Sequence, residues 1–410
     1  MVDGNGSEAS ATQAVRAAPR QADTAIEAYC VAGAEAISLY SAFCGEARYA
    51  PPQDPRWVGT WAESCKTEIV TAVLESAGRP LLALALEVTM EGPIRVARFV
   101  GGTHANGNFP AIAGNTTKHI GEADIRVLLR AIGRERNDID LVKLERQVGQ
   151  LAGIANPLLR IGAGPSPNPA LAVDLSGGFD AVLSRTSGKR KRKKHRSQTR
   201  KFEAAGGFRR VEGQTRAETD RLLDAFFEMK SVRFAAMGIH NVFADAAVQH
   251  FFRELFGREA GHVRPGFVLH GLEVGGKLRA VTGSSITEDT IICEFGSIAE
   301  DDLAFASPGD FLFFENIREA CEMGLAVYDF SVGDEAYKRL WCDIETPHHD
   351  VLFPLSAKGH AAALARRTAG TAKRLIKGNP LLWQTVKRLR RSAAGKAAAR
   401  SAPSKETIGE

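Results

Sequence analysis

The sequence predicts an α/β protein built of α+β mixed sheets, and three stretches in its second half carry this prediction. Residues 290–298 alternate β-branched and aromatic residues at period 2, as a half-buried strand does. Residues 311–321 then place apolar side chains at helical spacing, and a short apolar strand follows at 325–330. Residues 266–286 form two apolar runs around a Gly-Gly turn, which predicts a hairpin. We therefore expect a hairpin, a strand, a helix and a strand in this order.

The start of the predicted helix has the chemistry of a phosphate site. Ser307 stands at the N-cap position, Pro308 at the first helical position, and Asp310 three residues after the cap. The first turn of a helix leaves backbone N–H groups without intrahelical partners, and such groups bind phosphate. The turn therefore predicts a place for a pyrophosphate, although a simple helix cap is the more common explanation of such residues.

A longer string follows this helix. Residues 329–341 read DFSVGDEAYKRLW and have the form DFxxGDExYKxxW. With the Ser-Pro-Gly helix start and a basic helix upstream, the chain resembles the acetyltransferase domain of the cellulose-biosynthesis type (CelD or BcsL). This is a branch of the GNAT superfamily, related in architecture to the FemAB aminoacyl transferases. The resemblance covers roughly residues 45–390 and is most specific over residues 180–345.

The resemblance implies two GNAT-like lobes in tandem with a basic helical C-terminal tail. A Pro/Gly-rich segment at residues 155–170 predicts the connection between the lobes. The expected division is a disordered leader at residues 1–24, an N-terminal lobe at 25–165, the acetyltransferase lobe at 166–355 and a helical or disordered tail at 356–410. The expected acyl donor is acetyl-CoA, without a metal.

The expected first lobe is defined less sharply. An Ala-rich, helix-permissive stretch covers residues 25–44, and a second helix restarts after three prolines, where Trp57 and Trp61 share one face and predict core packing. A hairpin is expected at residues 80–101. A helix at 124–132 and a strand at 138–144 follow it.

Acyl transfer to an amine needs an uncharged nucleophile and a base, and a carboxylate suffices as base if burial raises its pKa. Glu294 interrupts a strand and Asp329 ends the next one, so both are candidate bases, although a strand acid can equally face solvent. The family string adds Asp334 and Lys338, whose spacing also suits a simple i,i+4 ion pair. The predicted catalytic residues are Asp329, Glu294, Asp334 and Lys338, and the predicted cofactor-binding residues are Ser307, Pro308, Gly309 and Phe311.

The acceptor side is expected at an amphipathic helix over residues 215–237 and the turn that follows it, where the superfamily admits its acceptor. For His240 a surface turn is the competing interpretation. A Gly/Asn loop at residues 101–110 offers weaker candidates, His104, Asn106 and Asn108, which ordinary turn chemistry also explains. The predicted substrate-binding residues are Lys230, Arg233, His240, Phe243 and Trp341.

Charge is unevenly distributed along the 410 residues, whose net charge is +5. Residues 184–202 hold ten Lys or Arg and no acid, and residues 355–410 hold thirteen bases and two acids, which leaves −16 for the rest. The basic segment Lys189–Lys201 predicts a solvated helix face or contact with a phosphate, an anionic membrane surface or RNA. The C-terminal tail could pack on the acidic body or lie on an anionic membrane.

The remaining composition bounds the class of protein. No window approaches the ~20 consecutive apolar residues that span a bilayer, and the N-terminus lacks a secretory apolar region, so we expect a cytoplasmic protein. The six cysteines lack paired or histidine spacing, which argues against a zinc site and against a disulfide scaffold.

The expected function is acyl transfer from acyl-CoA to an amine or hydroxyl of a sugar, polysaccharide precursor or small molecule. One alternative is a FemAB-like aminoacyl transferase that uses aminoacyl-tRNA. The other alternative is an inactive protein that docks on an anionic membrane or nucleic acid.

Overall fold

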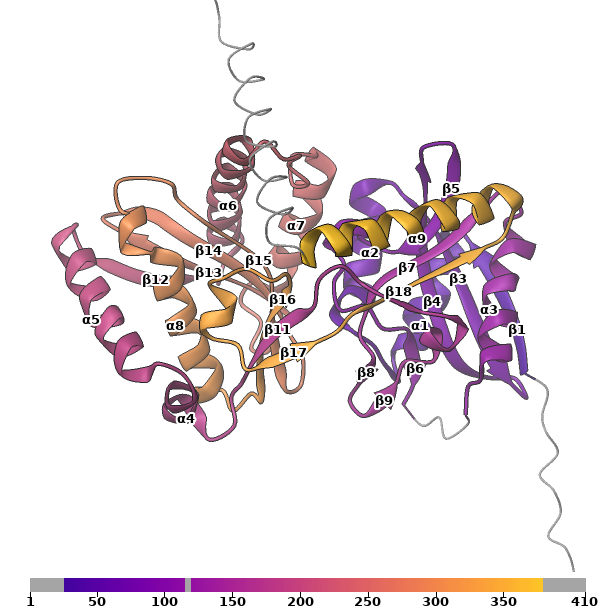
Figure 1. The fold of residues 1–410 in the computed structure, drawn as a ribbon, viewed down its shortest axis with the longest axis horizontal. Coiled ribbons are helices and arrows are strands. Elements are labelled where there is room, and N and C mark those ends of the chain that lie inside the picture. Colours follow the sequence, from indigo (N-terminus) through magenta and orange to yellow (C-terminus); the bar gives the residue numbers. More distant parts are fainter. Residues whose placement is uncertain (1–25, 115–118, 379–410) are drawn as a thin grey trace, which may run out of the picture.

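The computed structural model describes residues 26–114 and 119–378, with side chains up to residue 369, and shows two lobes side by side (Figure 1). The helices and strands that belong to the first lobe are β1 (Ile26–Ala32), α1 (Ala34–Cys44), β2 (Ala47–Arg48), α2 (Pro55–Cys65), β3 (Glu68–Ser76), β4 (Arg79–Glu91), β5 (Ile94–Phe99), β6 (Ala111–Ala113), α3 (Glu122–Glu135), β7 (Leu141–Gln147), a small hairpin of β8 (Gln150–Leu151) and β9 (Ile154–Ala155), β10 (Gly164–Pro165), β18 (His349–Pro354) and α9 (Ala357–Gly378).

The second lobe contains the predicted hairpin, strand, helix and strand. Its elements are β11 (Ala170–Asp174), α4 (Gly178–Arg185), α5 (Gly188–Ala204), β12 (Phe208–Glu212), α6 (Arg216–Met237), α7 (Ala246–Glu259), β13 (Phe267–Val274), β14 (Lys277–Ile286), β15 (Thr290–Ile298), α8 (Pro308–Glu322), β16 (Val327–Val332) and β17 (Ile344–Thr346). The α/β class with mixed sheets is confirmed.

The two lobes repeat one topology. In the first sheet the strand order is β1-β3-β4-β5-β7-β18-β10, and in the second it is β12-β13-β14-β15-β16-β11-β17. The central parallel pair is β5 with β7 in one sheet and β15 with β16 in the other. In each lobe two helices follow the first strand, and one crossover helix, α3 or α8, joins the parallel strands. The sequence shows no repeat, so this equivalence lies in the fold alone.

The chain exchanges one strand between the lobes in each direction. After the first lobe, β10 stays in the first sheet and β11 crosses to pair with β16 in the second. After the second lobe, β17 stays in the second sheet and β18 crosses back to pair with β7. Figure 1 shows the chain running from β17 in the second lobe to β18 in the first. Two crossing segments therefore connect the lobes.

This exchange corrects the predicted domain boundaries. The division at residue 355 places residues 349–354 in the second lobe, but they form β18 of the first sheet. The tail predicted from residue 356 begins as α9, which packs on the first lobe: Ala363 is buried, and Arg366 donates to Glu91 at 2.6 Å. The leader and the part of the tail beyond residue 378 lie outside the described residues.

The expectation for the first 20 residues of the first lobe is also corrected. Residues 26–32 of the Ala-rich stretch form strand β1, and only residues 34–44 are helical. Strand β1 pairs along its whole length with β3, from Ile26 opposite Ser76 to Ala32 opposite Val70. Pairing with a distant strand thus overrides the helix propensity of alanine.

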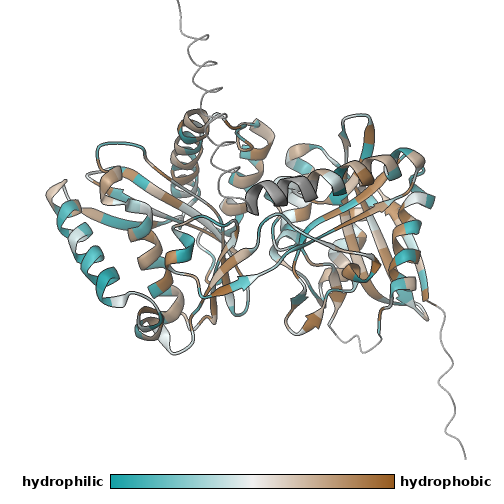
Figure 2. Cartoon of the chain, in the orientation of Figure 1, coloured by the Kyte–Doolittle hydropathy of each residue, from teal (hydrophilic) through white to brown (hydrophobic). Residues whose placement is uncertain are grey.

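Apolar residues fill the space between the lobes as well as each lobe's own core. The largest cluster joins Trp57 and Trp61 of α2 with Phe226 of α6 and Phe251 of α7, so the predicted core role of the two tryptophans is confirmed. In Figure 2 the strands and inward helix faces are mainly brown, whereas α5 is largely teal.

In the part of the chain that is described, no helix combines the length and apolar character needed to cross a bilayer.

One difference between the sheets decides where a cavity can form. In the first lobe β5 pairs with β7 over three positions, and Asn108 then continues beside β7, with hydrogen bonds to Arg146 and Val148 of 2.9 and 3.1 Å. In the second lobe β15 pairs with β16 only from Thr290 to Ile292, and β15 continues to Ile298 without this partner. The gap between the parallel strands is filled in the first lobe and open in the second.

Candidate active site

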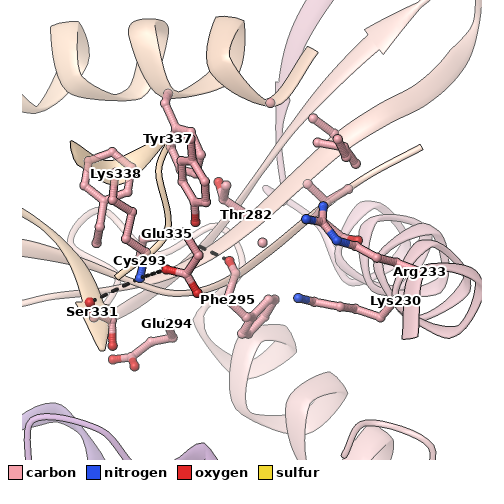
Figure 3. A pocket seen from close by; sticks show the side chains of 18 of the residues that line it. Lys230, Arg233, Thr282, Cys293, Glu294, Phe295, Ser331, Glu335, Tyr337 and Lys338 are labelled. Carbon is pink, nitrogen blue, oxygen red and sulfur yellow. Dashed lines mark hydrogen bonds and ion pairs between the residues drawn. The ribbon is translucent and has the colours of Figure 1, made fainter. Parts of the chain in front are cut away.

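A cavity of about 680 Å³ lies where β15 and β16 separate (Figure 3). Six consecutive residues of β15, from Cys293 to Ile298, line it, which a paired strand with alternating faces would not allow. The first lobe closes one wall with Trp57, Thr103, His104 and Asn106. The cavity is therefore shared by both lobes, with β15 along its floor.

Glu294 of β15 is a buried carboxylic acid in this cavity. One carboxylate oxygen accepts a 2.7 Å hydrogen bond from the Ser285 hydroxyl, and the other is buried without a partner in the described part of the chain. Burial raises the pKa of Glu294 to about 8, and nearby Asp329 adds to the rise. Such a group can accept a proton near neutral pH.

Asp329 lies within β16, at the last position where β16 pairs with β15, and it does not line the cavity. One of its carboxylate oxygens accepts a 2.6 Å hydrogen bond from the backbone N–H of Ser331. Burial raises the pKa of Asp329 to about 6, against the lowering effects of the Ser331 N–H and of Lys338. Its position suits an electrostatic effect on Glu294 better than contact with a reacting atom.

The Lys338 ammonium, predicted as catalytic, is fully engaged in local structure. Its Nζ donates to the carbonyl oxygens of Ser331 and Val332 at 3.3 and 3.0 Å and pairs with Glu335 at 3.0 Å. Its side chain is 5% exposed. These contacts fix the end of β16 and the turn after it, although Lys338 also lines the cavity.

Asp334 does not pair with Lys338, in contrast to the simple i,i+4 alternative. Its carboxylate accepts a 2.6 Å hydrogen bond from Arg339, and it does not line the cavity. The family string thus forms a braced turn in which Ser331 and Gly333 adopt positive φ angles. Much of the family string therefore consists of residues that hold this turn in place.

The start of α8 lies at the other end of the cavity, and its capping chemistry differs from the expectation. Ser307 and Gly309 line the cavity. Ser307 has the left-handed φ of 56°, and its hydroxyl makes no capping hydrogen bond. The carboxylate of Asp310 pairs with Lys194 at 2.9 Å and accepts from the Trp341 indole at 3.3 Å. No capping box forms, because Asp310 turns toward α5.

Three other predicted residues are buried packing groups outside the cavity wall. Pro308 is buried in the first turn, Phe311 is 1% exposed, and Trp341 is 1% exposed. The His195 ring stacks on Phe311 with centroids 4.4 Å apart, which docks α5 on α8. Lys191 lies over the Trp341 ring at 4.1 Å. Phe311, predicted to bind the cofactor, and Trp341, predicted to bind the substrate, therefore lie behind the cavity wall.

Helix α6 brings two cations and an aromatic wall to the cavity. Helix α6 begins with the capping box of Thr215 and Glu218. Lys230 and Arg233 line the cavity, and both side chains point into it in Figure 3. Phe243 from the following turn also lines it, whereas the predicted substrate residue His240 is exposed and lies outside its wall.

Two of the three candidates in the Gly/Asn loop of the first lobe line the cavity, and the third does not. His104 lines the cavity, with ring centroids 4.9 Å from Phe243, and burial lowers its pKa to about 4. Asn106 also lines it. Asn108 is buried and structural: its amide donates to the Glu145 carbonyl at 2.8 Å and its Oδ1 accepts from Gln53.

Several residues that line the cavity are not among those that the sequence predicts. Tyr337, quoted only as part of the string, lines it, and its ring stacks on Phe313 with centroids 5.6 Å apart. Burial raises the pKa of the Tyr337 hydroxyl, and burial raises that of the Cys293 thiol to about 12. Both groups therefore stay protonated at neutral pH. Neighbouring residues of a paired strand face opposite sides, so a strand pattern places either Cys293 or Glu294 at a cavity. The open edge of β15 allows both residues to line it.

One group of metal-type ligands lies away from this cavity. Glu212, His270 and Glu319 place their ligand atoms within 4.8 Å of one another. Arg210 already donates to both carboxylate oxygens of Glu319 and, at 3.0 Å, to Asn316. Since a guanidinium neutralises this carboxylate, the group is explained as a side-chain network of the second lobe.

Residues 189–339 match a family model described as an acetyltransferase (GNAT) domain. FemX has a similar fold: the alignment covers 79% of this chain and 97% of FemX at 10% identity, with a TM-score of 0.53. The C-terminal domain of a putative lysylphosphatidylglycerol synthetase from Agrobacterium fabrum is also similar, at 12% identity over 82% of this chain and 96% of that one, with a TM-score of 0.48. No curated protein matches the sequence.

The family match falls on the lobe that contains the cavity. Residues 189–339 of the second lobe therefore match a GNAT-type acetyltransferase domain, and the protein is an acyltransferase. At its low identity, the likeness to FemX supports the fold of two lobes and no more. The specific resemblance to the cellulose-biosynthesis type goes beyond these matches.

Proposed function

We propose that the protein transfers an acetyl or other acyl group from acyl-CoA to an amine or hydroxyl of a sugar, a polysaccharide precursor or a small molecule. The observation that carries this proposal is the cavity between β15 and β16, which has the first turn of α8 at one end and the buried acid Glu294 on its floor. The acceptor class follows from the resemblance to the cellulose-biosynthesis type.

The donor end of the cavity suits acyl-CoA in two respects. Beyond Ile292, β15 has no partner on the β16 side, so its backbone groups there are available to the amides of an extended pantetheine arm. The backbone N–H of Gly309 has no partner among the described residues and lies at a helix start. Asp310 would repel a phosphate, but its pairing with Lys194 offsets that charge.

Glu294 is the proposed general base. The acyl donor supplies an activated thioester carbonyl. An acceptor amine arrives largely as an ammonium ion, and the free oxygen of Glu294 takes its proton, directly or through water, so that the C–N bond can form. The Ser285 hydroxyl holds the other oxygen and so fixes the orientation of the carboxylate. Asp329 adds negative charge behind it, which keeps its pKa high.

Tyr337 is the proposed acid for the leaving group. When the C–S bond breaks, the thiolate needs a proton, and the Tyr337 hydroxyl is protonated and lines the cavity. The tyrosinate recovers its proton from water after product release. The ring stack on Phe313 holds the tyrosine in place. Lys338 and Glu335 brace the turn that carries it.

Calorimetric titration with acetyl-CoA tests the donor. We expect saturable binding by the wild type and by Glu294→Gln, because the variant should lose catalytic rate and not donor affinity. Gly309→Glu should lose binding, because the new side chain places a negative charge at the helix start and its Cβ would lie 2.7 Å from Ile298. Gly45→Glu is the control, since Gly45 is exposed with a helical φ. No binding by the wild type would refute the proposed donor.

A second candidate, transfer from aminoacyl-tRNA, is favoured by the outer face of α5. Five bases there are exposed and have no ion pair within the described residues: Lys189, Arg190, Lys193, Arg196 and Arg200. Such a row suits a nucleic-acid backbone. Tight, salt-dependent binding of tRNA that is lost when these five bases are neutralised, with no binding of acetyl-CoA, would establish this alternative. The same binding seen with anionic vesicles would instead indicate membrane docking.

A further inference from the structure

The charges that face the cavity do not balance. Two of its cations have partners: Lys194 pairs with Asp310 at 2.9 Å, and Lys338 pairs with Glu335 at 3.0 Å. The other two, Lys230 and Arg233, have no carboxylate partner in the described part of the chain. Both come from α6, three residues apart, and therefore share one helix face.

The surroundings of Lys230 leave its charge poorly compensated. Its ammonium lies 5.1 to 5.9 Å from the ring centroids of Phe226, Phe234 and Phe243. Aromatic faces attract a cation only modestly, at about 1 to 2 kcal/mol. Burial and the nearby Arg233 lower the pKa of Lys230 to about 8. A buried cation without a counter-ion is costly, and an anion would relieve that cost.

The nearby acids do not supply this anion. Glu294 is mostly protonated at neutral pH, because burial raises its pKa to about 8. Asp329 accepts from the Ser331 N–H and lies outside the cavity wall. Glu335 is engaged by Lys338. The unliganded cavity thus carries an excess of positive charge on its α6 side.

The α6 side of the cavity and its proposed donor end lie on opposite faces of the second sheet. Helix α6 packs on the face of the second sheet that carries Val281 and Phe295, together with α7 and the first lobe. Helix α8 packs on the opposite face, where Phe311 and Leu312 join Leu272 and Ala280. The two free cations therefore lie across the sheet from the helix start that is proposed to bind the donor.

We propose that the acceptor carries an anionic group, a phosphate or a carboxylate, and that Lys230 and Arg233 bind it. This inference rests on the proposed function, because it describes the acceptor of the same cavity. A guanidinium and an ammonium on one helix face can share the oxygens of one such group. An uncharged acceptor would leave both cations unpaired, so the site selects against it.

Anion binding in the presence of acetyl-CoA tests the proposal. Inorganic pyrophosphate and, separately, malonate are titrated by calorimetry with and without saturating acetyl-CoA. We expect at least one of them to bind with the donor present, and Lys230→Met and Arg233→Met each to weaken this binding about tenfold or more. Lys66→Met, at the exposed C-terminal end of α2, is the matched control and should bind as the wild type does. Lys230→Arg keeps the charge and should retain most of the binding.

Three results would overturn the proposal: no binding of either anion by the wild type, unchanged binding by both variants, or displacement of the anion by acetyl-CoA with loss of acetyl-CoA affinity in the variants. The last would show that the two cations hold the phosphates of the donor. A wild type that binds no acetyl-CoA, yet binds the anion through Lys230 and Arg233, would refute the proposed donor and leave the anion site standing.

Discussion

The Ser285 hydroxyl donates a 2.7 Å hydrogen bond to one carboxylate oxygen of Glu294 and leaves the other oxygen buried without a partner in the part of the chain that the structure describes. The two residues lie on neighbouring strands, β14 and β15, just where the register of this pair shifts between Gly283 and Ser284. One hydrogen bond fixes the orientation of the carboxyl group, but its second oxygen has no hydrogen-bond partner among the described residues. The free oxygen is therefore suited to take part in proton transfer.

Glu294→Gln should lower kcat by about 10²- to 10⁴-fold, the usual contribution of a general base. A base works in its deprotonated form, so the wild-type rate should rise with pH and level off above about pH 8. The variant should lack this rise. A pH series of kcat/KM, once an acceptor is in hand, measures both. Glu288→Gln, in the exposed turn before β15, is the control, and a wild-type profile in the Glu294 variant would contradict the assignment.

The same group should make stability depend on pH. The pKa of Glu294 is higher in the folded state, at about 8, than the value of 4.5 for an unperturbed glutamate. Between these values the unfolded state binds fewer protons, so the free energy of unfolding falls as pH rises. Urea unfolding from pH 5 to pH 8 should show a steeper fall for the wild type than for Glu294→Gln, and equal slopes would show that the carboxyl group is not buried in solution.

Lys338→Met should destabilise the protein by about 2 kcal/mol, because a buried ammonium loses bonds to two carbonyl oxygens and to Glu335. Urea unfolding monitors the loss. Lys193→Met, at an exposed lysine without an ion pair among the described residues, should change the free energy of unfolding by less than about 0.5 kcal/mol. A variant of unchanged stability but abolished turnover would restore the catalytic role that the sequence suggests.

Phe353→Ala tests the exchange of strands between the lobes. Phe353 lies on β18, close to the end of the described chain, yet it is 9% exposed and belongs to the core of the first lobe. Its loss should cost about 3 kcal/mol. Compared with the wild type, the variant should show a larger increase in amide hydrogen exchange in β7 than in β15, because β18 pairs with β7. Phe305→Ala, at a side chain 68% exposed, is the control. Equal acceleration in both sheets would indicate that the lobes unfold as one unit.

The sequence predicts most of the second lobe because its signals are local. The capping residues Thr215 and Asp245 mark the starts of α6 and α7, and a Gly-Gly turn marks the hairpin of β13 and β14. The strand exchange has no such signal, since the partner of β18 lies more than 200 residues away in the first lobe. Likewise β1 depends on pairing with β3, which local propensity does not reveal.

The site is predictable to a similar degree. The strand pattern indicates Glu294, the family resemblance indicates Lys230, Arg233 and Phe243, and all four line the cavity. The family string misleads for Asp334, which the structure places in a braced turn outside the cavity wall. The string combines residues that line the cavity with residues that hold the turn, and only the three-dimensional contacts separate them. Tyr337 lines the cavity, and only its place there distinguishes it from the residues that hold the turn.

Ser307→Gly should stabilise the protein by about 1 kcal/mol, although the sequence suggests that Ser307 caps α8. The residue has a left-handed φ of 56°, which costs a side-chain-bearing residue about 1 to 2 kcal/mol and a glycine almost nothing. Its hydroxyl makes no capping hydrogen bond, so the substitution loses little. Ser307→Ala keeps the strained angle and should gain nothing. If urea unfolding instead shows both variants about 1 kcal/mol less stable, the hydroxyl caps the helix in solution after all.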